Sequence, residues 1–255
     1  MRKIDVNADL GEGYGPYRIT DDAALLPLVT SVNIAGGGHA GDPMVMAETV
    51  QGAIKVKARF GCHIGYPDRQ GFGRRPMGLT HRELEMEVIS QLGALRAIAV
   101  HHGGELTHAN FHGALGNLSF ADADVARTLI GALKAFDPDL HFIGLPDTEA
   151  SRAAERQGLR LVRSFLADRG YSGPGRLAAR GTEGAVLHDP ALVQARVSAV
   201  LREERLTTLT GEEIPMPVDS ILVHSDTPRA LELAHAIRAG IEEAGCRISA
   251  YPAHQ

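Results

Sequence analysis

The alternation of short apolar runs with helical patterns along this 255-residue chain predicts an α/β fold around a parallel sheet. Two further observations favour a closed, irregular barrel over an open doubly wound sheet. Residues 10–16, after the first expected strand, are glycine-rich but lack the G-x-G-x-x-G register of a dinucleotide site, and no G-x-x-x-x-G-K-[ST] motif occurs. No Gly-, Ser- or Pro-rich linker divides the chain, so we expect one domain over residues 1–255.

Seven runs rich in apolar and β-branched residues are the expected barrel strands. They cover residues 3–9, 31–35, 61–66, 105–111, 140–145, 159–166 and 220–224. Residues 205–218 predict an additional hairpin that turns at Thr210 and Gly211. Pro215 and Pro217 restrict its second strand to a sheet edge, because proline has no backbone N–H to donate.

The helices between these strands carry recognisable start signals. Asp42, Asp189 and Asp226 each precede a proline closely, which is typical of a capped first helical turn. Thr80 and Glu83 form a capping-box pattern. Each start is followed by apolar residues at helical spacing, the face expected to pack on the barrel.

Composition excludes several classes of function. The formal net charge is -5 and the pI about 6.2, which argues against a nucleic-acid-binding surface. No stretch reaches the roughly 18 apolar residues that a membrane span requires, and the N-terminal segment lacks an apolar run of signal-peptide length. With only Cys62 and Cys246, the chain resembles a reduced intracellular protein, so we expect a cytoplasmic location.

Polar residues gather where the expected strands end. Asn7 and Asp9 share one side of the first strand, and Glu12 follows it. Barrel enzymes place catalytic groups at the carboxyl ends of their strands, so these acids are candidates for catalysis. The competing interpretation is that Asp9 only caps a loop.

Two further loops carry histidines. Gly37 and Gly38 precede His39, and such glycines let the backbone approach an anion, although a purely conformational duty is the alternative. His63 lies in the third strand. The loop after it carries groups suited to a carboxylate or phosphate, although some of its arginines can simply be solvated: Asp68, Arg69, Arg74 and Arg75.

The later strands repeat the pattern. His112 and Asn117 follow the fourth strand, Asp168, Arg169 and Arg180 follow the sixth, and His224 and Asp226 lie at the end of the seventh. For Asp226, helix capping is the competing role. Four of the twelve histidines thus fall near strand ends on one predicted face. This segregation indicates a small-molecule active site.

The motifs resemble those of the LamB/YcsF family, in the family's order and over nearly the whole chain. The matching strings begin with Val6-Asn7-Ala8-Asp9-Leu10-Gly11-Glu12, Asn33-Ile34-Ala35, His39-Ala40-Gly41-Asp42-Pro43, Gly65-Tyr66-Pro67-Asp68 and Gly71-Phe72-Gly73-Arg74-Arg75. They continue with His112-Gly113-Ala114-Leu115, Ala167-Asp168-Arg169, Gly184-Ala185-Val186, His188-Asp189-Pro190, Val223-His224 and Asp226-Thr227-Pro228.

The resemblance implies an irregular seven-stranded (β/α) barrel of the glycoside hydrolase/deacetylase type. It also implies the A subunit of a 5-oxoprolinase, which uses ATP, with magnesium, to open the lactam of 5-oxo-L-proline to L-glutamate together with the B and C subunits. On that basis the expected catalytic residues are Asp9, Glu12, His39, His63 and His112. The expected substrate-binding residues are Asn7, Gly37, Gly38, Asp68, Arg74, Asn117, Asp168, Arg169, Arg180, His224 and Asp226. A homo-oligomer is compatible with the sequence.

The chain departs from the family pattern, which marks it as a divergent member. Where the family usually has Cys, Phe, Pro, Lys, Pro and Tyr, this chain has Gly36, Gly38, Ile64, Asn110, Phe111 and Gly116. Two alternatives therefore stay open. One is a metal-dependent deacetylase or amidohydrolase that binds a divalent metal through Asp9, His63 and His112. The other is a non-catalytic binding paralogue, because an asparagine cannot supply the charge of the family lysine.

Overall fold

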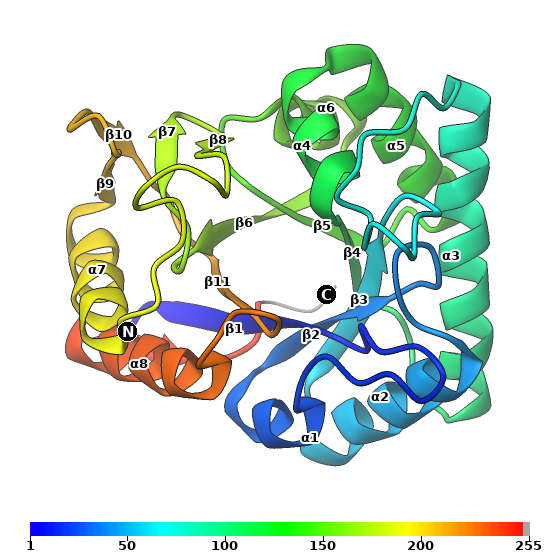
Figure 1. Ribbon diagram of the computed structural model, residues 1–255, viewed down its shortest axis with the longest axis horizontal. Helices are drawn as coiled ribbons and strands as arrows, with labels where there is room; N and C mark the ends of the chain where they lie inside the picture. The colour runs from blue at the N-terminus through cyan, green and yellow to red at the C-terminus, as the bar shows by residue number, and fades with distance from the viewer. Residues whose placement is uncertain (252–255) are drawn as a thin grey trace.

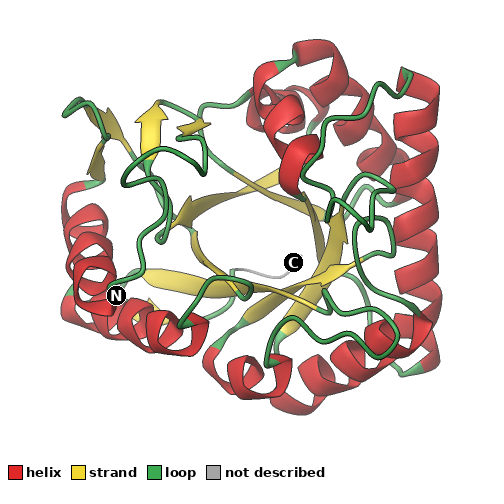
Figure 2. Cartoon of the chain, in the orientation of Figure 1, coloured by secondary structure: helices red, strands yellow, loops and turns green. Residues whose placement is uncertain are grey.

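Across residues 1–251, which the structure, a computed structural model, describes, seven parallel strands close into a ring surrounded by helices (Figures 1 and 2). The ring runs in the order β11-β6-β5-β4-β3-β2-β1, and β1 pairs with β11 to close it. The strands are β1 (Lys3–Leu10), β2 (Ser31–Ala35), β3 (Arg59–Ile64), β4 (His108–Phe111), β5 (His141–Gly144), β6 (Arg160–Leu166) and β11 (Ser220–His224). The predicted irregular α/β barrel is confirmed.

The observed strands lie close to their predicted ranges. β2 and β11 match residue for residue, whereas β4 begins at His108 rather than at residue 105. The expected hairpin is present as β9 (Arg205–Thr207) and β10 (Glu213–Pro215). The sequence analysis missed three very short strands: β7 (Tyr171–Gly173) and β8 (Arg176–Leu177), which form a second hairpin, and β12 (Arg247–Ile248), which pairs with β1.

Helices cover the outer face of the ring (Figure 1). They are α1 (Asp22–Leu25), the 3₁₀ turn η1 (Leu26–Leu28), α2 (Pro43–Val56), α3 (His81–His101), α4 (Gly113–Ala121), α5 (Ala123–Phe136), α6 (Glu149–Gln157), α7 (Pro190–Glu203) and α8 (Ala230–Glu243). Asp42 and Asp189 cap α2 and α7, and Thr80 with Glu83 forms the predicted capping box of α3. None of the helices among residues 1–251 combines the length and apolar composition needed to span a bilayer.

The predicted capping role of Asp226 is wrong. Helix α8 begins at Ala230, and its N-cap position is Arg229 in the left-handed conformation, with no side-chain cap. Asp226 is instead ion-paired with Arg74, and the neighbouring Thr227 donates a hydrogen bond to Asp168. Both side chains therefore belong to the carboxyl end of the barrel rather than to the helix.

The two faces of the barrel strands differ in chemistry. On β1, Ile4, Val6, Ala8 and Leu10 are fully buried apolar side chains. The alternate residues are polar, and they hydrogen-bond to β2 and β11 residues inside the ring: Asp5, Asn7 and Asp9. Burying a large aliphatic side chain such as Ile4 contributes roughly 1.5–3 kcal/mol. The apolar side chains thus pack against the surrounding helices. The polar side chains line the barrel interior as far as the carboxyl ends of the strands.

Candidate active site

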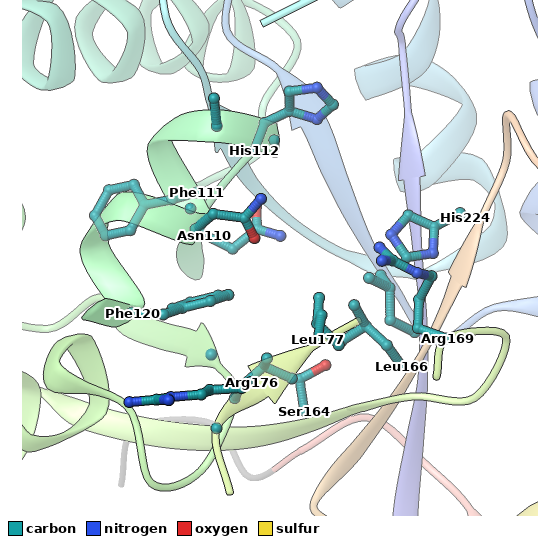
Figure 3. Close-up of a pocket in the computed structure, with 18 of the residues that line it drawn as sticks. Asn110, Phe111, His112, Phe120, Ser164, Leu166, Arg169, Arg176, Leu177 and His224 are labelled. Carbon is teal, nitrogen blue, oxygen red and sulfur yellow. The ribbon is translucent and has the colours of Figure 1, made fainter. Parts of the chain in front are cut away.

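A cavity of about 890 Å³ lies at the carboxyl ends of the barrel strands (Figure 3). Side chains of His112 and Asn110 face it from one wall, and His224 and Arg169 lie across from them. Its lining also includes Asp9, Glu12, His63, Arg74, Asn117, Arg180 and Asp226, with an apolar section formed by Phe111, Phe120, Leu145, Leu166, Leu177 and Leu222. Strand ends from around the ring therefore converge on one cavity.

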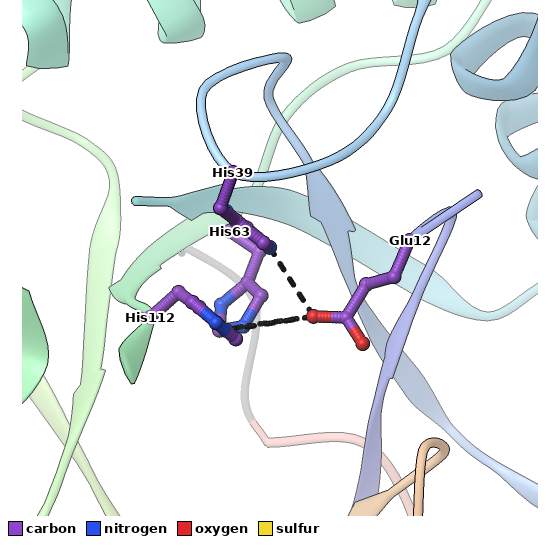
Figure 4. Close-up of side chains that lie close together, drawn as sticks. All are labelled: Glu12, His39, His63 and His112. Carbon is purple, nitrogen blue, oxygen red and sulfur yellow. Dashed lines mark hydrogen bonds and ion pairs between the residues drawn. The ribbon is translucent and has the colours of Figure 1, made fainter. Parts of the chain in front are cut away.

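One wall holds a buried cluster of a carboxylate and three imidazoles (Figure 4). The Glu12 Oε1 atom lies 3.2 Å from His39 Nε2, 3.7 Å from His63 Nε2 and 3.5 Å from His112 Nδ1. His63 Nε2 and His112 Nδ1 are 2.9 Å apart. The His39 and His112 rings stack with their centroids 3.8 Å apart. The four side chains thus direct four donor atoms toward one point.

The outer ring nitrogens fix how two of these imidazoles are protonated. His63 Nδ1 lies 2.7 Å from Asn110 Oδ1, and His112 Nε2 lies 2.8 Å from the backbone carbonyl of Phe72. An amide oxygen only accepts, so each outer nitrogen carries the proton. His63 Nε2 and His112 Nδ1 then direct lone pairs at one another, an arrangement that requires a proton or a cation between them.

Burial controls the charge of this cluster. It raises the pKa of Glu12 well above its usual value, and the nearby Asp9 carboxylate adds to the effect. Burial also lowers the pKa of His39 and of His112 well below the usual histidine value. Neutral imidazoles and a carboxylate are donors that zinc prefers, so Glu12 would release its proton on binding the ion.

The spacing of the donor atoms can be compared with that of a zinc site. Zinc–nitrogen bonds of about 2.0–2.1 Å place the donors of a tetrahedral site roughly 3.3 Å apart. Four of the six donor–donor distances fall between 2.9 and 3.7 Å, and all six lie within 4.8 Å, so the set is somewhat wider than a tetrahedral zinc site. Metal-binding histidines also typically donate their outer N–H to a carbonyl oxygen, as His63 and His112 do here.

The metal set expected from the sequence needs correction. The converging group consists of Glu12, His39, His63 and His112, and Asp9 is not among its members. Asp9 lies beside the group, with its Oδ2 atom 3.6 Å from His63 Nε2. Its other oxygen accepts a hydrogen bond from Asn33 Nδ2 at 2.7 Å.

The opposite wall holds a second acid–histidine pair. His224 Nδ1 lies 2.9 and 3.0 Å from the two carboxylate oxygens of Asp168, and Thr227 donates to the same carboxylate. Burial opposes the charged form of His224, but the Asp168 carboxylate outweighs it, so the pKa of His224 is raised. Since Nδ1 is held by Asp168, Nε2 is the atom free to exchange a proton with a ligand. Beside this pair, Arg74 bonds to Asp226 at 2.5 Å.

Five of the predicted substrate-binding residues do not line the cavity. One is Asp168, which reaches it only through His224. Asp68 forms an ion pair on its own loop, with Arg75. The other three lie deeper in the barrel or in the loop after β2, away from the cavity lining: Asn7, Gly37 and Gly38.

The close packing around Gln91 of α3 leaves little room for side chains at two positions where the chain departs from the family pattern. The buried side chain of Gln91 bonds to the backbone N–H and carbonyl of Gly65. A Cβ atom at Gly36 would lie 2.7 Å from Cys62 Sγ and 2.8 Å from Gln91 Cβ. A Cβ atom at Gly38 would lie 2.6 Å from the Gly65 carbonyl oxygen and 2.7 Å from Gln91 Nε2. Gln91 thus fills space that larger side chains at these glycines would need.

Substitution of Gly116 by Ala is expected to destabilise the protein. A Cβ at this position would lie 2.7 Å from the Phe111 carbonyl oxygen, so α4 must shift away from the end of β4. Such overpacking costs about 1–3 kcal/mol, which corresponds to a fall in Tm of roughly 2–12 °C for a chain of this size. Thermal unfolding followed by circular dichroism measures the effect, and Gly78→Ala, where a Cβ meets open space, is the control. An unchanged Tm for Gly116→Ala would show that α4 accommodates a side chain there.

Fold and site together define an α/β-barrel protein with the acid, histidine and arginine side chains of a hydrolase-type centre at its strand ends. The chain belongs to the LamB/YcsF family, whose model matches residues 4–255. It is 50% identical to the 5-oxoprolinase A subunit numbered 2 of Ralstonia nicotianae, covering 96% of this chain and 95% of that protein. It is 46% identical to the 5-oxoprolinase A subunit numbered 1 of Pseudomonas syringae pv. tomato, covering 95% of each chain.

A solved structure supports the fold. The lactam utilization protein of Thermus thermophilus superposes with a TM-score of 0.92 at 37% identity, covering 98% of this chain and 100% of that one. The relatives above are named as subunits, so their names describe one component of an assembly.

Proposed function

We propose that this chain is a lactam-opening hydrolase subunit that acts on 5-oxo-L-proline, or a related lactam, with ATP and two partner subunits. The names of the relatives support the substrate class. The observation that carries the proposal is that two acid–histidine pairs meet at one cavity, Asp9 with His63 and Asp168 with His224.

Hydrolysis of a lactam needs two proton transfers at different places. Water loses a proton as its oxygen bonds to the carbonyl carbon, and the ring nitrogen gains one as the carbon–nitrogen bond breaks. In this proposal Asp9 and His63 orient the water and accept its proton. His224, held by Asp168, donates a proton to the leaving nitrogen. Two separate acid–histidine pairs thus match the two proton transfers.

The substrate carboxylate needs a cationic partner. Arg74 and Arg180 both line the cavity near His224, and Arg169 is held beside them by the backbone carbonyls of Ala178 and Ala185. Arginine suits a carboxylate because it can donate two parallel hydrogen bonds. An unstrained lactam is a poor electrophile. ATP therefore serves in the assembly to activate the carbonyl oxygen by phosphorylation before water attacks.

The experiment that tests this proposal measures glutamate and ADP together. Purified chain is incubated with 5-oxo-L-proline and magnesium-ATP, alone and with the B and C subunits. We expect both products to appear in equal amounts only in the complete mixture. Release of glutamate by the chain alone, without ATP, would contradict the proposed dependence on ATP and partners.

The facing lone pairs of His63 and His112 favour a second candidate, a metal-dependent hydrolase. In this alternative Glu12, His39, His63 and His112 hold a divalent ion, to which their donor set and spacing are suited. An ion bound there would act as a Lewis acid on a carbonyl oxygen. Asp9 and His224 keep their proton-transfer roles, so the two candidates differ in what activates the carbonyl.

Replacement of Asn110 by Leu is expected to lower zinc affinity about 10–100-fold. The reason is that His63 loses the hydrogen bond that keeps its proton on Nδ1 and its Nε2 lone pair available to the ion. Asn110 is the only contact that the structure gives to His63 Nδ1 among residues 1–251. Titration calorimetry with zinc measures the change, and Asn117→Leu, on the exposed part of the same cavity wall, is the control. Equal affinity in both variants, or no zinc binding by the unmodified protein, would exclude the metal-dependent candidate.

A further inference from the structure

The interior of the barrel contains a hydrogen-bonded line that ends on Asp9. We propose that Asn33 of β2 and His108 of β4 are positioning residues that hold the Asp9 carboxylate in its working orientation. This inference rests on the proposed function, because it assigns a role to residues that act through Asp9. Asn33 and His108 are fully buried, and neither lines the cavity.

The line begins at the carboxylate. Asn33 Nδ2 donates to Asp9 Oδ1 at 2.7 Å, and His108 Nε2 lies 2.8 Å from Asn33 Oδ1. Because an amide oxygen only accepts, the proton of His108 must be on Nε2. In the ring β3 lies between β2 and β4, and Gly61 of β3 is the register partner of both residues, so the contact between Asn33 and His108 passes over β3 at Gly61. Gly61 makes room for it, since a Cβ there would lie 2.5 Å from the His108 ring.

A tyrosine near the end of the described chain fixes the other side of His108. The Tyr251 hydroxyl lies 2.6 Å from His108 Nδ1 and 2.9 Å from Thr107 Oγ1. With its proton on Nε2, His108 accepts at Nδ1, so Tyr251 is the donor of this bond. Burial lowers the pKa of His108 to about 3, which keeps the ring neutral at physiological pH. His108 is therefore held as one neutral tautomer from both sides.

A second set of contacts fixes Asn33 independently. Asn33 Nδ2 also donates to Asn7 Oδ1, and Asn7 Nδ2 donates to Ser31 Oγ at 2.7 Å. Ser31 in turn donates to the buried Asp5 carboxylate at 2.7 Å. Rotating the Asn33 amide by half a turn would place its oxygen against Asp9 and its NH₂ against the donor proton of His108. Both sets of contacts therefore select the orientation that donates to Asp9.

The hydrogen-bonded line determines which oxygen of Asp9 faces His63. With Oδ1 held by Asn33, the other oxygen of Asp9 faces His63 Nε2 at 3.6 Å. That oxygen is the one placed to orient a water or accept its proton. Loss of the line leaves Asp9 in place on β1 but frees its carboxylate to rotate, which alters the chemical step more than substrate binding. Misplacement of a reacting group by about 1 Å can cost 10²-fold in rate.

The test compares His108→Leu with His108→Gln in the complete assembly. Leucine removes the donor to Asn33, whereas the glutamine amide can restore it. We expect His108→Leu to lower kcat for glutamate formation about 10–100-fold with KM within about twofold, and His108→Gln to recover most of the loss. Thr49→Val deletes a buried hydroxyl that bonds within α2 and controls for general destabilisation. Equal kcat in His108→Leu and the unmodified assembly, or equal losses in Leu and Gln variants, would overturn the proposal.

A readout without turnover separates this inference from the proposed function. In protein labelled with ¹⁵N-asparagine, the Asn33 side-chain signal is identified by its loss in Asn33→Leu. We expect it to shift in Asp9→Asn and in His108→Leu, but not in Thr49→Val. If these shifts are observed but the unmodified assembly forms no glutamate, the proposed function is contradicted while the hydrogen-bonded line is supported. If the Asn33 signal shifts in neither Asp9→Asn nor His108→Leu, the proposed hydrogen-bonded line is contradicted.

Discussion

Replacement of Asp9 by Asn is expected to lower kcat for lactam opening by about 10²–10⁴-fold, the range that general acid–base groups contribute. The amide has the same shape and can still accept from Asn33, so the barrel interior is preserved. What is lost is the negative charge beside His63 and the ability to accept the proton of the attacking water. Initial rates of glutamate formation by the complete assembly measure the effect.

A matched control distinguishes the chemical role of Asp9 from the loss of any carboxylate. Asp21→Asn makes the same change at the N-cap of α1, where asparagine caps as well as aspartate. We expect its kcat to equal that of the unmodified protein. A kcat for Asp9→Asn within threefold of this control would remove Asp9 from the catalytic step.

Replacement of Asp168 by Asn is expected to lower kcat about 10²-fold or more and to shift the pH profile. Burial disfavours charge on His224, and the raised pKa of this ring depends on the Asp168 carboxylate; Asp9 adds to the effect and Arg180 opposes it. If protonated His224 is the acid, activity falls as the pH rises through its pKa. Removing the Asp168 charge lowers that pKa, so the alkaline limb of the profile moves to lower pH.

The pH profile of kcat between about pH 5 and 10 checks this prediction. Asp189→Asn, at the exposed N-cap of α7, is the matched control and should leave the alkaline limb unchanged. Thr227→Val removes one hydrogen bond to Asp168 but keeps its charge, so we expect no shift of the alkaline limb to lower pH. An alkaline limb that stays in place in Asp168→Asn would show that His224 is not the titrating acid.

The fold was predictable because its signals are local and repeated. Each barrel strand is a short apolar run, and the caps at Asp42, Thr80 and Asp189 mark helix starts that the structure confirms. The β7–β8 hairpin was missed because its strands have three and two residues, too few to carry a pattern. The start of α8 was mispredicted because Asp226 has a stronger partner in Arg74, distant in sequence.

The site was predictable only as a location. Strand-end positions correctly brought His63, His112 and His224 to one cavity. Sequence position could not show that His39 and Glu12 meet His63 while His224 lies on the opposite wall, because loop paths decide both. His108 was missed although it shares the alternation of Asn110 and His112, since the sequence gives no sign that it meets Asn33 over the strand between them.

The most direct test of the central claim is a crystal structure of the Asp9→Asn protein soaked with 5-oxo-L-proline. The account predicts the lactam in the 890 Å³ cavity, with its carbonyl oxygen beside His63 and His112, its ring nitrogen toward His224 and its carboxylate on Arg74 or Arg180. Lactam bound at a different surface, or bound in this cavity with its carbonyl directed away from the His63 wall, would contradict the account.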